Sequence, residues 1–273
     1  MSYRKKHIHP KIKGLKKKKV FFKKPLFWVC FAMLLCMAAG GALIWLPQFQ
    51  IKHIEISGNN NTNQEDIRAI ARSLGNTTLF SLGKFQIVTK TIFLADTQKI
   101  NTAILAAFPA IENAEVKKSL FETILITVKE RTPYALVCPQ ERDFTNGCFL
   151  LDENGVIFQP QEPAQGNFIT ILATEHATWA LGQGIIEKST INAISKIQKN
   201  LKNNFQIDIS QVNVSDPLIV TTSENWKIYF DPNSDIDLQI TKMNTLLNNQ
   251  ITKSARKSIQ YIYLQYKDRA YYK

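Results

Sequence analysis

A stretch of 21 residues from Leu26 to Leu46 contains no charged side chain, and it limits the architecture of the chain more than any other feature. As a helix rising about 1.5 Å per residue it extends about 32 Å, enough to cross a hydrocarbon core of about 30 Å. We therefore predict a single transmembrane helix at residues 25–47. The alternative is a cleaved signal peptide, but secretory apolar cores usually have only about 7 to 15 residues.

The segment before this stretch, residues 1–24, carries eleven Lys and Arg and no acidic residue. Positively charged flanks stay in the cytoplasm, which predicts a cytoplasmic basic tail, an extracytoplasmic remainder and a tail that attracts anionic membrane lipid. Without the tail, 23 Lys and Arg face 22 Asp and Glu, so the net charge falls from +12 to +1. A nearly neutral outer part argues against nucleic acid as a partner.

Hydrophobic periodicity in residues 48–132 predicts the order strand, helix, helix, strand, strand. Thr62 and Glu65 match a capping box at the start of the first helix, which Gly75 is expected to end, and Asp96 is expected to cap the second helix. Between the helices, Asn76 to Ala95 has neither a helical nor a strand period, and we expect a long loop there. The predicted strands are residues 51–57, 111–118 and 122–129.

Beyond Pro133 the pattern consists mainly of strands. Asn154-Gly155 lies between two apolar runs and predicts a hairpin over residues 149–158. Helices are predicted at residues 187–201 and from Ser234 onward. The fold class is therefore α+β, with one transmembrane helix, a β-α-α-β-β module and a mainly antiparallel β domain with flanking helices. The remaining predicted strands are residues 134–138, the region near 207, 218–222, 226–230 and 258–266.

Residue patterns for catalysis or metal binding are scarce. Beyond the span there are only two histidines, His53 and His176, and neither G-x-S-x-G nor H-E-x-x-H occurs. Glu175 beside His176, or the pair Asp152 and Glu153, could in principle act as acid and base. Because Asp152 and Glu153 lead into a turn, we interpret them as solvated turn carboxylates. We expect no enzyme activity, no catalytic residue, no cofactor, no metal and no small-molecule substrate.

Two cysteines, Cys138 and Cys148, lie beyond the span with nine residues between them. An oxidising compartment would permit a disulfide between them, and their spacing does not match a zinc pattern. Two alternatives stay open, a disulfide or two unpaired thiols.

The last predicted strand is rich in tyrosine. If it closes the sheet, its free backbone edge can accept a strand of a partner protein, and tyrosines are frequent interface anchors. The alternative is that these tyrosines only cover the core and rim of the domain. The candidate partner-binding residues on this strand are Tyr261, Ile262, Tyr263, Leu264, Gln265 and Tyr266.

Three local sequences resemble the FtsQ/DivIB family of bacterial cell-division proteins. They are Ile54-Glu-Ile-Ser-Gly-Asn59, Ala114-Glu-Val116, and Ile124-Leu-Ile-Thr-Val128 leading into Glu130-Arg-Thr-Pro133. The element order also resembles that family's POTRA (polypeptide-transport-associated) module, and the basic tail and single span match its layout.

The chain departs from the family pattern at three positions and in the unusually long connection from Gly75 to Asp96. Phe121 stands where the family usually has Pro, and Tyr263 and Gln265 replace the usual Asp and Arg of the closing strand. The resemblance therefore covers residues 1 to about 160 well and the remainder more thinly.

The resemblance implies a tail at 1–24, a transmembrane helix at 25–47, a POTRA domain at 48–132 and a beta domain at 133–273. It implies a non-catalytic scaffold of the plasma (inner) membrane, concentrated at the division septum. Such a scaffold binds divisome proteins of the FtsB/FtsL type and helps to localise or regulate septal wall synthases. It also implies recruitment through Val116 and Lys118 on the second POTRA strand. The alternative function is a POTRA-containing envelope protein of transport or outer-membrane assembly.

Overall fold

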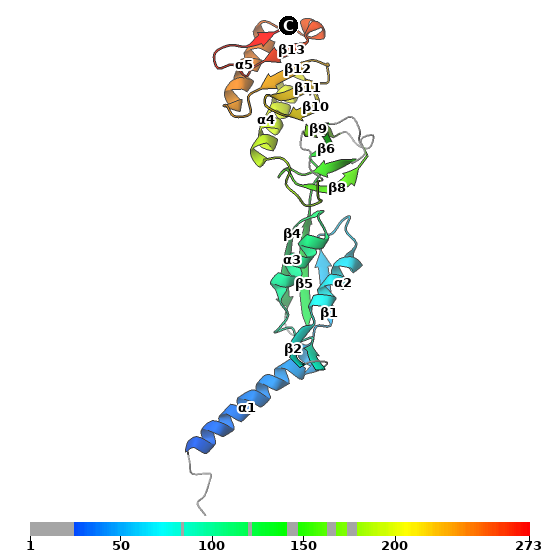
Figure 1. Ribbon diagram of the computed structural model, residues 1–273, viewed down its shortest axis with the longest axis vertical. Coiled ribbons are helices and arrows are strands. Elements are labelled where there is room, and N and C mark those ends of the chain that lie inside the picture. Colours follow the sequence, from blue (N-terminus) through cyan, green and yellow to red (C-terminus); the bar gives the residue numbers. More distant parts are fainter. Residues whose placement is uncertain (1–24, 83–84, 120–121, 141–146, 163–167, 174–178) are drawn as a thin grey trace, which may run out of the picture.

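The computed structural model describes residues 25–82, 85–119, 122–140, 147–162, 168–173 and 179–273. In Figure 1 the N-terminal helix α1, a small mixed unit and a larger β-rich unit follow one another along the long axis of an elongated molecule. The cations of the predicted tail, Phe121, and the Glu175–His176 pair lie outside the described residues.

Helix α1 (Pro25–Trp45) is apolar along its whole length, and residues 25–42 are not buried against any other described part of the chain. Exposure of so many large apolar side chains to water is unfavourable, whereas lipid accommodates them. This one N-terminal apolar helix therefore fits a single-pass membrane protein. A short 3-10 helix, η2 (Pro47–Phe49), leads from α1 into the first unit.

The first unit contains a three-stranded sheet in the order β1-β5-β4, with β1 parallel and β4 antiparallel to β5. Ile67 of one helix and Ile100 of the other are fully buried with Ile124 and Ile126 of the sheet. The mixed helix and sheet class predicted for this segment is confirmed. Its elements are β1 (His53–Ser57), α2 (Gln64–Leu74), α3 (Thr97–Ala107), β4 (Ile111–Ser119) and β5 (Thr123–Glu130).

The caps of the two helices are only partly as expected. The capping box at Thr62 is wrong, because Asn63 is the N-cap of α2 and its Oδ1 accepts a hydrogen bond of 3.0 Å from the Glu65 backbone N–H. The Thr62 N–H is instead bonded to the Glu130 carboxylate at 2.8 Å. The prediction for α3 is confirmed, since Asp96 accepts two backbone N–H groups of the first turn.

The segment expected to be a long loop between the helices contains a hairpin, β2 (Thr77–Leu82) and β3 (Phe85–Thr89). Its two strands pair antiparallel with each other and form a separate two-stranded sheet. The register shifts between Thr78 and Phe80. Such a bulge breaks the two-residue alternation from which a strand is predicted, which explains the error.

The second unit is a nine-stranded sheet in the order β14-β13-β12-β11-β10-β9-β6-β7-β8. Most neighbouring strands are antiparallel, but β9 is parallel to both β6 and β10, and β12 is parallel to β13. The β-rich character predicted for this segment is confirmed. The strands are β6 (Ala135–Pro139), β7 (Cys148–Leu151), β8 (Ile157–Gln161), β9 (Ile169–Ala173), β10 (Ile209–Val214), β11 (Leu218–Thr222), β12 (Lys227–Phe230), β13 (Tyr261–Tyr263) and β14 (Tyr271–Tyr272).

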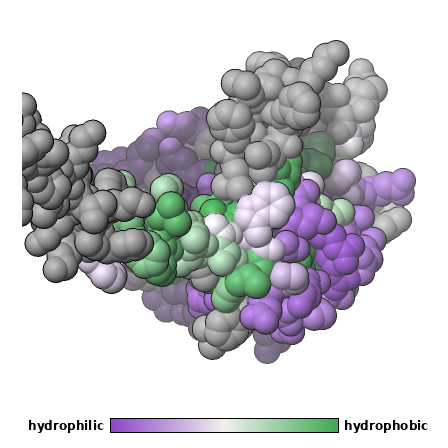
Figure 2. Space-filling view, turned by 90° about the horizontal axis from the view of Figure 1, so that it is seen from below, coloured by the Kyte–Doolittle hydropathy of each residue, from purple (hydrophilic) through white to green (hydrophobic). Residues whose placement is uncertain are grey.

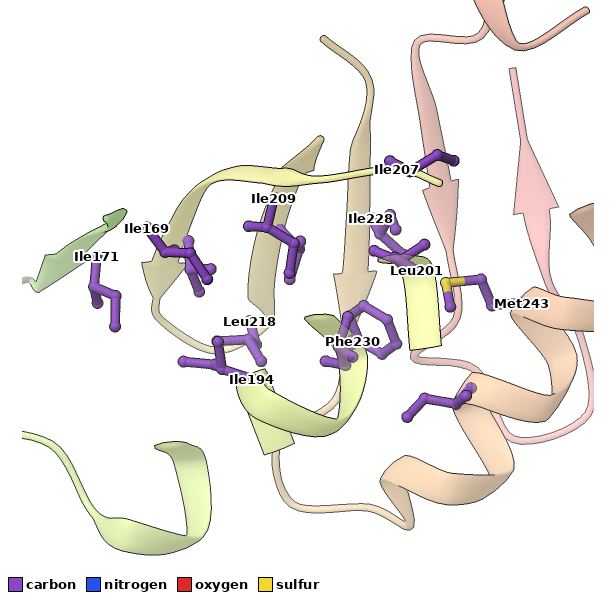
Figure 3. Close-up of a cluster of buried hydrophobic side chains, with 14 of the residues drawn as sticks. Ile169, Ile171, Ile194, Leu201, Ile207, Ile209, Leu218, Ile228, Phe230 and Met243 are labelled. Atoms are coloured by element: carbon purple, nitrogen blue, oxygen red, sulfur yellow. The ribbon is translucent and has the colours of Figure 1, made fainter. Parts of the chain in front are cut away.

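Helices α4 (Lys188–Phe205) and α5 (Ile236–Asn249) supply the other half of the core of this unit. Figure 3 shows Ile194 and Leu201 of α4 and Met243 of α5 beside Ile228 and Phe230 of β12. All five side chains are fully buried. This packing fixes the central strands and therefore the position of β13, which lies next to β12.

The two units meet at an ion pair that the sequence analysis did not anticipate. Arg131 Nη1 lies 2.5 Å from Asp152 Oδ2, and the Arg131 Nε–H donates to the Pro109 carbonyl at 3.0 Å. Asp152 Oδ1 also accepts the backbone N–H groups of Asn154 and Val156, both at 2.9 Å. Asp152 is therefore buried, with 2 % of its surface exposed, and its interpretation as a solvated turn carboxylate is wrong.

Candidate functional site: the C-terminal tyrosine surface

The strand predicted to bind a partner, residues 258–266, is shorter than expected. Strand β13 covers only Tyr261–Tyr263, and the 3-10 helix η4 (Ala255–Ser258) ends at the first residue of the predicted segment. Ile262 and Leu264 are fully buried in the core. The Leu264 N–H donates to the Tyr229 carbonyl at 2.9 Å, which extends the contact with β12 by one residue.

The free edge expected on this strand is covered in the structure by β14. Strand β14 pairs antiparallel with β13, opposing Tyr272 to Ile262 and Tyr271 to Tyr263. Lys273 continues the ladder, because its carbonyl accepts the Tyr261 N–H at 3.3 Å and its N–H donates to the Tyr261 carbonyl at 3.1 Å. The expectation that β13 presents an open edge is therefore wrong, and the outermost described strand is the two-residue β14.

Three rings on the face of β12 and β13 opposite the core form what we call the tyrosine face, Tyr229, Tyr261 and Tyr263. Parallel pairing places Tyr229 directly beside Tyr263, with ring centroids 4.5 Å apart, and Tyr261 follows at 4.7 Å from Tyr263. Rings in tilted contact at this distance stabilise one another and present a rigid surface. Partial burial, and the neighbouring tyrosines, raise the pKa of Tyr263 above its ordinary value.

A second pair of rings lies on the loop beyond β13. Tyr266 and Tyr271 are in edge-to-face contact at 5.5 Å, and each is about half exposed. Lys242 of α5 fixes this loop, since its Nζ donates to the carbonyls of Tyr266 and Lys267, both at 2.7 Å. Gln265 Oε1 is buried and has no hydrogen-bond partner among the described residues.

The C-terminal segment that carries most of these rings is rich in positive charge. Residues 242–273 contain seven Lys and Arg and only one acidic residue, Asp268. Arg256 is buried with its guanidinium 5.3 Å from the centre of the Phe205 ring, whereas Lys257, Lys267 and Arg269 are exposed. The net charge of the whole outer part conceals this local excess, which a count over shorter windows would have found.

In the first unit, the turn after β1 brings together two of the segments whose sequences resemble the FtsQ/DivIB family. Gly58, with φ at +84°, leaves no room for a side chain, because a Cβ atom there would lie 2.0 Å from the Val128 carbonyl oxygen. After this turn, the Glu130 carboxylate accepts the backbone N–H groups of Asn60, Asn61 and Thr62 at 2.8 to 3.1 Å. Although partial burial raises it, these N–H donors hold the pKa of Glu130 below its ordinary value.

A family model described as POTRA domain, FtsQ-type, matches residues 49–131. Residues 49–131 form an FtsQ-type POTRA domain. The match covers less than a third of the chain and supports the FtsQ/DivIB family, and POTRA domains of this type imply protein–protein interaction in cell division. Proteins with this type of POTRA domain are generally non-catalytic scaffolds. Among curated proteins, no sequence matches the chain.

Within the POTRA domain, Val116 and Lys118 lie on β4, which is an edge strand of the three-stranded sheet. Val116 is partly buried against the core, and the Lys118 Nζ donates to the Phe93 carbonyl at 3.0 Å. Asn101 of α3 donates to the Ala114 carbonyl at 2.7 Å and so occupies part of the edge. These two residues lie in a different sheet from the tyrosine face, so the structure does not bring the two predicted surfaces together.

Cys138 and Cys148 form a disulfide between β6 and β7, at the far end of the second sheet from β13. Both are buried with Leu136, Leu150 and Phe158. They lie one step beyond the opposed pair Val137 and Phe149, so the register of the two strands brings them face to face. The disulfide is remote from the tyrosine face, and it links two strands within a buried part of the sheet.

Proposed function

We propose that this chain is a non-catalytic, single-pass scaffold of the bacterial division machinery. The FtsQ-type POTRA domain carries this proposal, and the apolar α1 before it supports it. The proposed layout is a cytoplasmic tail at 1–24, a transmembrane helix at 25–47, a POTRA domain at 48–132 and an extracytoplasmic beta domain at 133–273. Its task is to hold FtsB/FtsL-type partners at the septum of the plasma membrane, where septal wall synthases act.

The proposed docking surface is the C-terminal one, Tyr261 to Tyr266 with the tyrosine face. Two features support it. Its rings are clustered, partly exposed and held by the buried Ile262 and Leu264 beneath them. The segment that carries most of its rings, residues 242–273, has seven cations against one acidic residue, which favours a partner segment rich in Asp and Glu. Val116 and Lys118 on the edge strand β4 are proposed as a second, separate contact.

Partner binding by strand addition requires an unpaired edge, and β14 occupies the edge of β13. We propose that the partner strand displaces β14, because β14 and the following Lys273 pair with β13 through only three residues, all of them exposed. A longer strand could then form main-chain hydrogen bonds along β13, while the tyrosine face supplies side-chain selectivity.

Replacing Tyr263 with Lys is the test of this surface. Loss of a central aromatic anchor is expected to weaken binding of an FtsB/FtsL-type complex about 30-fold, since such anchors are worth about 2 kcal/mol or more. Affinity is measured by calorimetric titration with the full chain in detergent. Phe168→Lys, which adds the same charge at another exposed aromatic residue of this unit, is the matched control. Equal affinities for Tyr263→Lys and the unaltered chain would exclude the site.

Localisation tests the wider proposal. A fluorescent fusion of the full chain is expected to form a band at midcell in dividing cells. An even signal around the envelope would contradict a role in division and favour the transport alternative.

A further inference from the structure

An open cavity of about 340 Å³ lies in the POTRA domain where the start of β1 meets the end of α2. Its lining includes the cations Lys52, Arg72 and Lys90, together with the polar side chains of Ser73 and Asn76, and it contains no acidic residue. Three cations around one cavity suit an anionic ligand, because Lys and Arg donate charge-assisted hydrogen bonds to phosphate and carboxylate oxygens.

Only one of the three cations that line this cavity forms an ion pair with a described residue. Lys52 Nζ lies 2.6 Å from Glu122 Oε2, and the hydrogen bond from Lys52 lowers the pKa of Glu122. Arg72 and Lys90 form no ion pair with any described residue, and both are exposed. Arg72 lies in the last turn of α2, where the helix dipole favours a cation. The dipole does not account for Lys90, which follows β3 and belongs to no helix.

The cavity lies at the end of the membrane-spanning helix. Thr89, the neighbour of Lys90, donates from its hydroxyl to the Ile44 carbonyl in the last turn of α1 at 3.2 Å. The Lys90 carbonyl accepts the Ile51 N–H at 3.0 Å. Lys90 is therefore fixed within a few ångströms of the point where the chain leaves α1, which is headgroup level if α1 crosses a bilayer.

Exposed apolar side chains border the same region. Phe93 packs on Phe49 with ring centroids 5.3 Å apart and is nevertheless 55 % exposed, and Val88 is 48 % exposed. Figure 2, which views the molecule from the end that carries α1, shows hydrophobic and hydrophilic surface side by side. Apolar groups beside cations match a membrane interface, where acyl chains and phosphates are adjacent.

We infer that this cavity binds the phosphate group of an anionic phospholipid in the membrane that α1 spans. Arg72 and Lys90 bind the phosphate oxygens, Lys52 lines the same cavity with its charge paired to Glu122, and Phe93 lies against the acyl region. The inference rests on α1 as a membrane span and needs no division partner. Binding of the lipid phosphate fixes the orientation of the POTRA domain at the bilayer surface.

Hydrogen exchange on the full chain in lipid nanodiscs tests the inference. Discs of phosphatidylcholine are compared with discs of phosphatidylcholine and phosphatidylglycerol in equal parts. Phosphatidylglycerol is expected to slow amide exchange about threefold or more in peptides covering residues 72–76 and 88–92, since bound ligand suppresses local opening. The double variant Arg72→Gln, Lys90→Gln should lose this protection while exchange in β5 stays unchanged, which shows that the domain is folded.

The control double variant Lys199→Gln, Lys253→Gln removes two exposed cations from the second unit and should keep the protection. Equal exchange in both kinds of disc, or protection that persists without Arg72 and Lys90, would overturn the inference. Inorganic phosphate added to phosphatidylcholine discs should give no protection. If it protects as strongly as phosphatidylglycerol, the cavity is a site for free phosphate and the lipid assignment is wrong. Partner titration and midcell localisation do not depend on this result, so the two proposals fail independently.

Discussion

At the scale of single residues, Glu130 shows how one side chain organises the POTRA domain. It lies at the end of β5, yet its carboxylate accepts three backbone N–H groups from the turn between β1 and α2. Those N–H groups precede a helix start and have no acceptor of their own within the helix. The residue was noted in the sequence as part of a family-like segment, but its partners, 68 to 70 positions away, could not be predicted from local pattern.

Glu130→Gln is therefore expected to lower the free energy of unfolding by about 1 kcal/mol at pH 7, a value reduced for partial exposure. Because the folded pKa of Glu130 is depressed, this stabilisation is present above the unfolded pKa of about 4.3 and is lost as pH falls through the folded pKa. Urea unfolding of the full chain in detergent at neutral and acid pH measures the difference. Glu55→Gln, at an exposed carboxylate on β1, should change little at either pH.

At the scale of elements, prediction succeeded where a segment has a clear period and an end signal. The β-α-α-β-β order and the Asp96 cap followed from local residues. The hairpin β2–β3 was missed because a bulge hides its alternation, and β9 was missed although Ile169 and Ile171 alternate with Thr170. Strand β9 pairs with β6 and β10, which lie far from it in sequence, so only the assembled sheet reveals its central place.

In the candidate site, too, the residues with a clear local period were predicted and the others were not. Tyr261 and Tyr263 were predicted to alternate with the buried Ile262 and Leu264, and this is observed. Tyr266 was expected on the same side as Ile262 and Leu264, but it lies beyond the strand and is 48 % exposed. The pairing of Tyr271 and Tyr272 with β13 was not predicted, because two residues give no periodic signal.

Removal of strand β14 is expected to change partner binding. If the partner displaces β14, a chain truncated after Arg269 should bind an FtsB/FtsL-type complex about five- to tenfold more tightly, because the competing strand is gone. Calorimetric titration of truncated and full chains provides the comparison. Weaker binding by the truncated chain would mean instead that the partner docks on β14 itself.

The link between β6 and β7 is tested by intact mass. Protein purified from the envelope without reductant should be lighter by the mass of two hydrogen atoms than the same protein after reduction, with the difference in the peptides of Cys138 and Cys148. This result would also place the second unit in an oxidising compartment. Identical masses before and after reduction would contradict the disulfide.

At the scale of the whole molecule, the joint between the two units depends on Arg131 and Asp152. Both side chains are largely buried, and removing one partner of a buried ion pair leaves an uncompensated charge. Arg131→Met is therefore expected to lower the free energy of unfolding by about 3 kcal/mol. Lys129→Met, two residues away, removes an exposed ion pair with Glu112 and should cost at most about 0.5 kcal/mol.

Urea unfolding of the full chain in detergent measures both variants. In the double variant Arg131→Met, Asp152→Asn, the Asn side-chain oxygen can still accept the N–H groups of Asn154 and Val156, so much of the lost stability should return. A loss for Arg131→Met no larger than that for Lys129→Met would show that the ion pair does not hold the joint.

The Arg131–Asp152 pair also determines how relatives of this protein can be recombined. A chimera joined at Pro133 would take Arg131 from one parent and Asp152 from the other. The neighbouring contact between Glu112 and Asn154 would be divided between the parents in the same way. Parents that differ at these positions would yield a fusion protein with mismatched residues at the joint, even if each half folds well by itself. A crossover placed after Val156 takes all of these contacts from one parent, so chimeras that exchange binding specificity should be joined there.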